Sequence, residues 1–449
     1  NMVDHLPTLC AMAGVAARSP AWDEAASPVG LTGRLDHASV RPVTGGNDMD
    51  RMDGVAAWRA VGRELAQRFA PRAATWDRER RYCHENVAEM RAAGVMGMTL
   101  PTALGGKGAS FAEACAVVEE VAKACTLSAR IVVEANMGGI AGVMAYGTQA
   151  QKALAAELVL SGDKPAICIT EPGAGSAATE MTTEARKVAG GWTLHGTKCW
   201  ITGGGVSRLH LVFARAMDAE GAALGIGGFL AVIDPTAPPR GFRIARHERT
   251  LGLCGMPEAE LVFDGLFVPE DMAMDPPGGF ARGFGALMSA YNSQRVGAGT
   301  VALGVAQGAF DLARAHLRER EQFGRPLAEF QGLQWMAGEM DARLHASRLM
   351  LMEAAGTRGP EGLFPERIAA ARAKLFATQA AISVVSDALQ MFGARGFGSE
   401  TPLERMYRDV RMFTIGGGTA EVLRTQVGGA ALGVRTPQTR DGYLRPAGA

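Results

Sequence analysis

The sequence has few of the features that mark membrane, nucleic-acid-binding or secreted proteins. Its 46 basic and 46 acidic residues cancel, so no global field attracts nucleic acid or an acidic membrane surface. No apolar run reaches the length of a transmembrane helix. The first residues lack the basic and apolar regions of a secretory leader. We therefore expect a cytoplasmic protein that binds neither nucleic acid nor a membrane.

Metal-binding patterns are also missing. The seven cysteines and eight histidines are scattered, and neither CxxC nor HExxH spacing occurs, so no metal site is predicted. An odd number of separate cysteines indicates reduced, mostly buried thiols. What the sequence does have is length and apolar content. Its 449 residues, 47% of them hydrophobic and 20% charged, are enough for two or three globular domains.

The apolar periodicity divides the chain into three structured regions. Helical spacing predicts an N-terminal α-helical domain over 53–163. Short strand-like runs with regular turns predict a middle antiparallel β-domain over 164–277. The helical period then returns and predicts a C-terminal four-helix-bundle domain over 278–436. The fold class is therefore α+β, and residues 1–52 and 437–449 are expected to be a poorly ordered extension and a tail.

Individual helices can be placed within these regions. The small, apolar stretch Arg130–Tyr146 is one of the helical segments of the first domain. The long helices predicted for the last domain are Phe284–Arg318, Gly332–Gly356, Pro365–Phe392 and Ala420–Leu432.

Two segments of the β-region could bind a ligand. Thr170–Ser176 reads T-E-P-G-A-G-S after a strand, and its glycines permit a loop that donates backbone N–H groups to a phosphate or a flavin carbonyl. A plain β-bend is the alternative. Lys198–Gly205 offers Trp200 and Thr202, which could wall a planar ring and hydrogen bond to its edge. The alternative there is a buried tryptophan at a strand end.

Two segments of the C-terminal region have similar potential. Arg320–Pro326 follows a long helix, and its arginines suit a pyrophosphate, although basic residues also stabilise a helix C-terminus. Gly416–Gly418 leads into Thr419, where a helix begins and a negatively charged group would be favoured. A flexible turn is the alternative for the three glycines.

Together these segments resemble the acyl-CoA dehydrogenase family. The dipeptide Val268-Pro269, the run from Gln390 to Phe397 and Arg408-Asp409 match it as well. The resemblance covers roughly residues 55–435, with the motifs in family order. It implies an N-terminal helical domain, a middle β-domain and a C-terminal four-helix bundle. It also implies an acyl-CoA substrate, bound FAD and a homotetramer.

The resemblance assigns cofactor contacts residue by residue. Thr170 and Thr202 would hydrogen bond to the isoalloxazine edge, with Trp200 against the ring. Ser176 would lie near the phosphate ends of FAD and acyl-CoA. Three residues would reach the FAD of a neighbouring subunit, and four more would complete the site: Arg320, Gln322 and Phe323, then Gln390, Gly393, Thr419 and Glu421.

The chain departs from the family at the catalytic base. A dehydrogenase needs a carboxylate that removes the α-proton of the thioester while a hydride leaves for the flavin. In most members this carboxylate lies just before the Gly-Thr of the glycine segment, where this chain has Gly417. In other members it precedes an arginine on the first bundle helix, where this chain has Gln294 before Arg295. An amide is not a useful base near neutral pH.

Three explanations follow. The base could come from elsewhere, with Glu134 and Asp409 as candidates, or the protein could be a non-catalytic flavoprotein. The chemistry could also need no α-proton abstraction. Long stretches are similar to family members that cleave the C–S bond of an acyl-CoA sulfinate without net oxidation, and these also lack both carboxylates.

That resemblance implies roles for five residues. Arg130 would bind the sulfinate, whose two oxygens suit a guanidinium, although a surface arginine is the alternative. Gln294 and Arg295 would line the acyl site, and Gly417 would leave room for the head group. Arg130 and Gln294 are therefore the predicted catalytic residues, and Ser176 completes the predicted substrate contacts.

Overall fold

A computed structural model describes residues 48–274, 276–360 and 362–434. Most of the extension predicted over 1–52 and all of the tail predicted over 437–449 lie outside the described residues. Within the described part, helix α2 begins at Asp48. Residues 48–52, which the predicted extension included, belong to that helix.

The N-terminal region is helical, as predicted. Its helices are α2 (Asp48–Glu79), α3 (His84–Ala92), α4 (Phe111–Ala122), α5 (Thr126–Asn136), α6 (Gly139–Tyr146) and α7 (Gln149–Leu160). Capping boxes at Ser110 and Thr148 fix the starts of α4 and α7, because each hydroxyl and a side chain three residues later satisfy free N–H groups. The prediction of one continuous segment over Arg130–Tyr146 is wrong, since α5 ends at Asn136 and the chain turns at Gly138 before α6.

The middle region is a single large sheet. Its strands are β1 (Ala166–Cys168), β2 (Glu184–Val188), β3 (Gly191–Thr202), β4 (Leu209–Met217), β5 (Ala223–Val232), β6 (Phe242–His247), β7 (Glu258–Pro269) and β8 (Ala273–Met274). The order is β6-β7-β3-β2-β4-β5-β8, with β1 also pairing with β4. The prediction of an antiparallel domain is wrong in part, because both β1 and β2 run parallel to β4. The remaining pairs are antiparallel.

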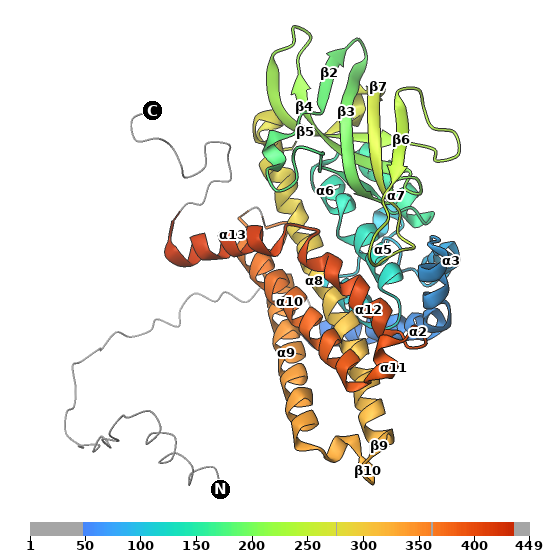
Figure 1. Ribbon diagram of the computed structural model, residues 1–449. Helices are drawn as coiled ribbons and strands as arrows, with labels where there is room; N and C mark the ends of the chain where they lie inside the picture. The colour runs from blue at the N-terminus through green and yellow to red at the C-terminus, as the bar shows by residue number, and fades with distance from the viewer. Residues whose placement is uncertain (1–47, 275, 361, 435–449) are drawn as a thin grey trace, which may run out of the picture. The chain divides into compact units, whose positions relative to one another are not determined.

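The C-terminal region contains the four predicted long helices. They are α8 (Gly279–Glu319), α9 (Gln331–Gly356), α10 (Arg367–Met391) and α13 (Ala420–Leu432). Short elements connect them: β9 (Glu321–Gln322), β10 (Arg325–Pro326), α11 (Ala394–Phe397), α12 (Leu403–Val410) and the 3-10 turn η5 (Arg411–Thr414). Figure 1 shows α8, α9 and α10 side by side, with α8 reaching from the sheet to the β9–β10 hairpin. Helix α8 also packs against α4, α5 and α6, so it joins all three regions.

Among the described residues, two helices are long and apolar enough, by composition, to cross a membrane. They are α8 and α10, and 83% and 50% of their most apolar windows are buried inside the protein. They depart from the expectation that no apolar run reaches transmembrane length. Core helices of a folded domain have the same composition, so this property alone is weak support for a membrane span.

Candidate active site

Residues predicted to bind substrate meet where α5, α8 and the glycine loop (Gly416–Gly418) come together. Arg130 Nη2 lies 2.7 Å from Glu134 Oε1, one turn along α5. Gln294 on α8 donates a hydrogen bond from Nε2 to the same oxygen at 3.0 Å. The next residue, Arg295, donates from Nε to the carbonyl of Gly417 at 3.2 Å. We call these five residues the junction site, and all except Gly417 are at least nine-tenths buried.

Small residues on α8 make this meeting possible. Gly297 faces α5, and a Cβ built there would lie 2.8 Å from both Val133 Cγ1 and Met137 Sδ. The two helix backbones can approach so closely only because that side chain is missing. Gln294, one turn earlier, is thereby brought within hydrogen-bond distance of Glu134. A bulky residue at 297 would open the junction site.

The glycine loop is held by buried cations. Lys374 on α10 donates from Nζ to the carbonyls of Gly416 (2.5 Å) and Gly418 (2.6 Å), while Arg295 binds the carbonyl between them. Gly417 and Gly418 have φ values of +78° and +93°, a backbone region that side chains disfavour. Each of the three carbonyls of the loop therefore accepts a hydrogen bond from a buried basic side chain.

Sequence inspection missed Lys374. Its side chain is completely buried on a helix whose neighbouring inward positions are alanines. A lysine on the apolar face of a helix was the signal that could have found it. Burial, together with the positive charges of Arg295 and Arg130, lowers its pKa to about 7.

Two more ionisable groups lie close to the junction site on its sheet side, and both were missed. Burial raises the pKa of Glu258 to about 7, and this carboxylate accepts a hydrogen bond from Thr202 Oγ1 at 2.8 Å. Burial also lowers the pKa of Lys164, whose Nζ donates to the carbonyl of Thr202 at 2.9 Å. The charges of Glu134 and Arg130 act on both groups. The surroundings therefore hold four basic side chains (Arg130, Lys164, Arg295, Lys374) against two carboxylates (Glu134, Glu258), an excess that favours an anionic ligand.

The junction site is also incompletely bonded. Arg130 Nε and Gln294 Oε1 are buried and have no hydrogen-bond partner. Most buried polar atoms in folded proteins do have one, so such atoms mark strain or a place where a ligand binds. Here two of them lie on residues that share one carboxylate, which identifies a polar surface able to hold a small charged group.

The predicted cofactor residues of the β-region lie near the ends of β1 and β3. Trp200 sits in a bulge of β3 between Lys198 and Ile201, with φ +56° and 54% of its surface exposed. An exposed indole on a strained backbone is typical of a functional position. Thr202, two residues on, is partly buried. The indole is therefore exposed, unlike the buried tryptophan that was the alternative, and its contact with a planar ring stays a prediction.

The neighbouring loop, Thr170–Ser176, is exposed at its glycines and is held from the protein interior by Glu171. A Cβ at Gly173 or Gly175 would meet nothing within 4 Å, and Thr170 and Ser176 are partly or fully exposed. Beneath the loop, the buried Glu171 carboxylate accepts from Lys198 Nζ at 2.8 Å. A fixed loop with free space over its glycines fits a phosphate-bearing, flat cofactor such as FAD.

The other predicted cofactor residues are far from this loop within one chain. Arg320, Gln322 and Phe323 are exposed at the β9–β10 hairpin, and the side chain of Phe323 is 92% exposed. Gln390 and Gly393 lie on the surface where α10 meets α11. In Figure 1 both groups lie at the end of the bundle opposite the sheet. One cofactor could not contact them and Trp200 on the same chain.

Helix α13 begins at the residues predicted to bind the cofactor next to the glycine loop. Thr419 is its N-cap, and its hydroxyl accepts from the Val422 amide at 3.2 Å. Glu421 is exposed in the first turn, where its own backbone N–H lowers its pKa. The N-terminus of α13 therefore already carries one carboxylate.

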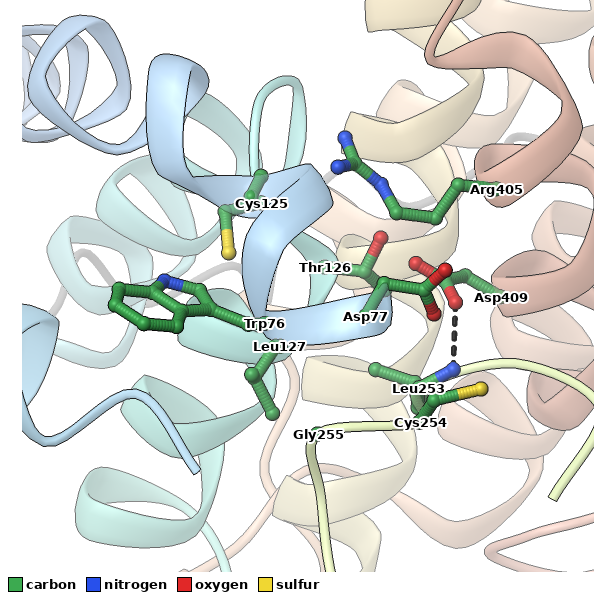
Figure 2. A pocket seen from close by; sticks show the side chains of 11 residues that line it. Trp76, Asp77, Cys125, Thr126, Leu127, Leu253, Cys254, Gly255, Arg405 and Asp409 are labelled. Atoms are coloured by element: carbon green, nitrogen blue, oxygen red, sulfur yellow. Dashed lines mark hydrogen bonds between the residues drawn. The ribbon is translucent and has the colours of Figure 1, made fainter. Parts of the chain in front are cut away.

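Asp409 lies in a different place from the junction site. Figure 2 shows it in a recess between α2, the start of α5, the 253–255 segment and α12, with the guanidinium of Arg405 nearby. Its Oδ1 accepts the Leu253 amide at 2.5 Å, and burial raises its pKa. The structure gives this carboxylate a role in holding the 253–255 segment, which does not suit a base for a thioester bound beside Arg130.

Metal ligands and disulfides do not contribute within the described residues. No group of three His, Cys, Asp or Glu side chains there is placed to hold a metal ion. The described cysteines are free thiols, and four of these six are buried: Cys83, Cys125, Cys168 and Cys199.

A helical region, a mixed sheet and a helical bundle that meet at one polar site define an acyl-CoA dehydrogenase architecture. The sequence matches the acyl-CoA dehydrogenase N-terminal domain over residues 53–163, the middle domain over 166–266 and the C-terminal domain over 281–432. The chain belongs to the acyl-CoA dehydrogenase family.

Individual proteins of known name are also similar to the chain. The chain is 55% identical to 3-sulfinopropanoyl-CoA desulfinase of Variovorax paradoxus, covering 87% of this chain and 97% of that protein. It is 53% identical to the enzyme of the same name from Advenella mimigardefordensis, with 86% and 95% covered. Among solved structures, butyryl-CoA dehydrogenase of Megasphaera elsdenii superimposes with a TM-score of 0.78 at 29% identity, covering 85% and 98%. Glutaryl-CoA dehydrogenase of Mycobacterium smegmatis in complex with FADH2 gives 0.77 at 26%, covering 86% and 95%.

Proposed function

We propose that the protein is an FAD-containing desulfinase that cleaves the C–S bond of 3-sulfinopropionyl-CoA, giving propionyl-CoA and sulfite. The observation that carries the proposal is the junction site. It offers a buried arginine with an unpartnered Nε, an excess of basic groups around it, and no carboxylate at 294 or 417. The names of the relatives support the same substrate.

The chemistry of the substrate fits this site. A sulfinate is an anion with two acceptor oxygens, and a guanidinium offers several donors in one plane. A carboxylate side chain in place of Gly417 or Gln294 would repel the sulfinate. The overall reaction consumes one water: a C–H bond replaces the C–S bond, the sulfur leaves as sulfite, and no electrons are released. A base that removes the α-proton is therefore not required.

Residues on both sides of the junction site would hold the rest of the substrate and the cofactor. Thr170, Trp200 and Thr202 would contact the flavin ring, and Ser176 would face the phosphate ends. FAD, when bound, supplies a flat aromatic surface and an electron-accepting ring next to the acyl chain. The side chains of this chain bind and orient the thioester, and Gln294 with Arg295 would line its acyl end.

One contact favours a second candidate function. Glu134 is a carboxylate inside the junction site, so it could act as the displaced base of a dehydrogenase for a short or dicarboxyl-like acyl-CoA. Its Oε1 already accepts from Gln294 and lies against Arg130. Neither contact involves Oε2, so the names of the relatives, and not this geometry, decide between the two functions. The desulfinase is therefore the function we favour.

The separation of the predicted cofactor residues supports an assembly of several copies, and the expectation of a homotetramer comes from the resemblance to the family. If Arg320, Gln322 and Phe323 contact FAD, that FAD belongs to another copy of the chain. Exposed apolar side chains along the bundle, Phe323 (92%) and Trp335 (63%) among them, would be covered by such contacts. Sedimentation analysis would test the assembly, and a cytoplasmic location stays a prediction.

One assay tests the proposed function. The FAD-loaded protein is incubated with 3-sulfinopropionyl-CoA, and sulfite and propionyl-CoA are measured without an electron acceptor. In parallel it receives butyryl-, isobutyryl- or glutaryl-CoA with an acceptor dye. We expect sulfite in the first reaction and no dye reduction in the second. Dye reduction without sulfite would instead support the dehydrogenase, and no product in either would indicate a non-catalytic flavoprotein.

A further inference from the structure

Glu134 has no role in the proposed reaction, yet it is the centre of the junction site. Its Oε1 lies 2.7 Å from Arg130 Nη2 and accepts from Gln294 Nε2 at 3.0 Å. The backbone leaves room for its other oxygen, because a Cβ on Gly138 would lie only 2.6 Å from Glu134 Oε2. Glu134 is only 2% exposed. Nothing in binding an anion requires a buried negative charge there, so its presence needs an explanation.

We propose that Glu134 is the positioning residue of the junction site. It draws the Arg130 guanidinium and the Gln294 amide to a single oxygen, so that the unpartnered Arg130 Nε and Gln294 Oε1 are presented together. This inference rests on the proposed desulfinase function, and it names the group that orients the sulfinate-binding arginine. A long arginine side chain otherwise has many rotamers, and ordering it in advance removes that entropy cost from substrate binding.

The contact between Gln294 and Glu134 also explains why residue 294 carries an amide side chain and not a carboxylate. A carboxylate at 294 would bring two acidic groups to about the 3.0 Å that now separates Gln294 Nε2 from Glu134 Oε1. Two such groups cannot both stay charged, and the pair would take up a proton. Gln294 instead donates an N–H to Glu134. The missing base at 294 and the presence of Glu134 are therefore two parts of one arrangement.

The first experiment separates positioning from binding. Glu134→Gln leaves the Arg130 charge intact but removes its fixed partner. We expect kcat for sulfite release to fall by about 10- to 100-fold, as misplaced reacting groups generally cause. The KM for 3-sulfinopropionyl-CoA should stay within about twofold, because the lost ordering of Arg130 and the lost competition from Glu134 act on substrate binding in opposite directions. Because misfolded enzyme also lowers the apparent kcat at unchanged KM, kcat is calculated per folded, FAD-loaded molecule.

The second experiment tests the coupling between the two residues. Gln294→Glu should lower kcat/KM at pH 8 and recover part of it toward pH 6, where the carboxylate pair holds a proton. The double variant Glu134→Gln/Gln294→Glu again has one amide and one carboxylate in contact. We expect it to be at least about fivefold more active at pH 8 than the product of the two single losses would give, since contacting residues are not additive.

Two further variants distinguish a specific role of Glu134 from misfolding and from a general loss of activity. Gly138→Ala pushes on Glu134 Oε2 without changing any charge, and it should lower kcat in the same direction. Glu119→Gln is the matched control. Glu119 is also buried (4% exposed) and ion-paired, to Arg348 at 2.8 Å and Arg59 at 3.2 Å, but it lies outside the site. Its loss should lower the unfolding temperature and leave kcat within twofold of the parent enzyme.

The outcomes are distinguishable. A parent enzyme that releases no sulfite contradicts the proposed function itself. An active parent with losses that simply multiply in the double variant overturns the positioning role of Glu134. The role is also overturned if kcat of folded, FAD-loaded Glu134→Gln lies within twofold of the parent. Should Glu134→Gln not fold, an unchanged kcat in Gly138→Ala overturns it equally.

Discussion

Two buried glutamates, each facing a basic side chain, differ in how completely they are bonded. In the sheet region, Glu171 accepts from Lys198 Nζ, from Thr182 N and Oγ1, and from Thr183 N, at 2.6 to 2.9 Å. Lys198 also donates to the carbonyl of Ile169 at 2.9 Å. This network fixes the loop that begins at Thr170, and it leaves the pair fully bonded.

The pair in the junction site is incomplete by comparison. Glu134 meets Arg130 and Gln294 through one oxygen, while Arg130 Nε and Gln294 Oε1 have no partner. A complete buried pair holds structure, whereas an incomplete one keeps donors and acceptors available to a ligand at some cost in stability. Burial and charge do not distinguish the Glu171 pair from the Glu134 pair, whereas the number of hydrogen bonds does.

The largest effect is expected from breaking the incomplete pair of Arg130 and Glu134. Arg130→Lys keeps the positive charge but loses the planar fork that fits a sulfinate. We expect kcat/KM for sulfite release to fall by about 100-fold or more, since loss of a buried charged contact costs about 2–5 kcal/mol. FAD content and the unfolding temperature, measured on the same preparation, should change little. A kcat/KM within threefold of the parent would remove Arg130 from the site.

Breaking the complete pair should instead affect folding. Lys198→Met leaves the Glu171 carboxylate buried without its cation, a change that costs about 3–5 kcal/mol. Urea unfolding of the FAD-loaded protein measures the loss. The double variant Glu171→Gln/Lys198→Met should recover a large part of it, because no unpaired charge remains. A loss below about 1 kcal/mol in Lys198→Met would contradict the contrast between the two pairs.

Lys374 extends the comparison to a buried cation that has only carbonyl partners. Its pKa is about 7 in the folded protein, below the ordinary 10.5 that applies to the unfolded chain. Between these values the unfolded chain binds more protons, so this group makes stability rise with pH across that window. Each pH unit contributes at most about 1.4 kcal/mol. Unfolding free energies from pH 7 to 9 should therefore rise less in Lys374→Met than in the parent, and equal slopes would refute the assignment.

Much of the fold could be predicted because it depends on local patterns. Helical spacing and strand-like runs are properties of neighbouring residues, and they predicted the α, β, α order. Parallel pairing of β1 and β2 with β4 could not be predicted, since it depends on contacts between segments distant in sequence. The break between α5 and α6 carries no proline, and only the glycines after Met137 hint at it.

The candidate site was predictable where family motifs mark it and not elsewhere. Arg130, Gln294 and Gly417 were singled out because they stand at positions with known counterparts. Lys374 was missed because a lysine in a helical pattern is normally assigned to the solvent face. Glu134 was named only as a possible base, and its contact with both Arg130 and Gln294 depends on the close approach of α5 and α8 at Gly297.

The smallest expected effect is the acid dependence of the complete pair. The hydrogen bonds and charge of Lys198, with the backbone and hydroxyl donors of Thr182 and Thr183, hold the pKa of Glu171 at about 2, against an ordinary value of 4.5. A lowered carboxyl pKa contributes stability that is fully present above about pH 4.5 and is lost as pH falls toward 2. Unfolding free energies at pH 5.5 and pH 3.5 should therefore differ by about 1 kcal/mol more in the parent than in Glu171→Gln. Because other carboxylates titrate equally in both proteins, the difference between the two isolates Glu171. An identical pH dependence in the two proteins would contradict the tight network around Glu171.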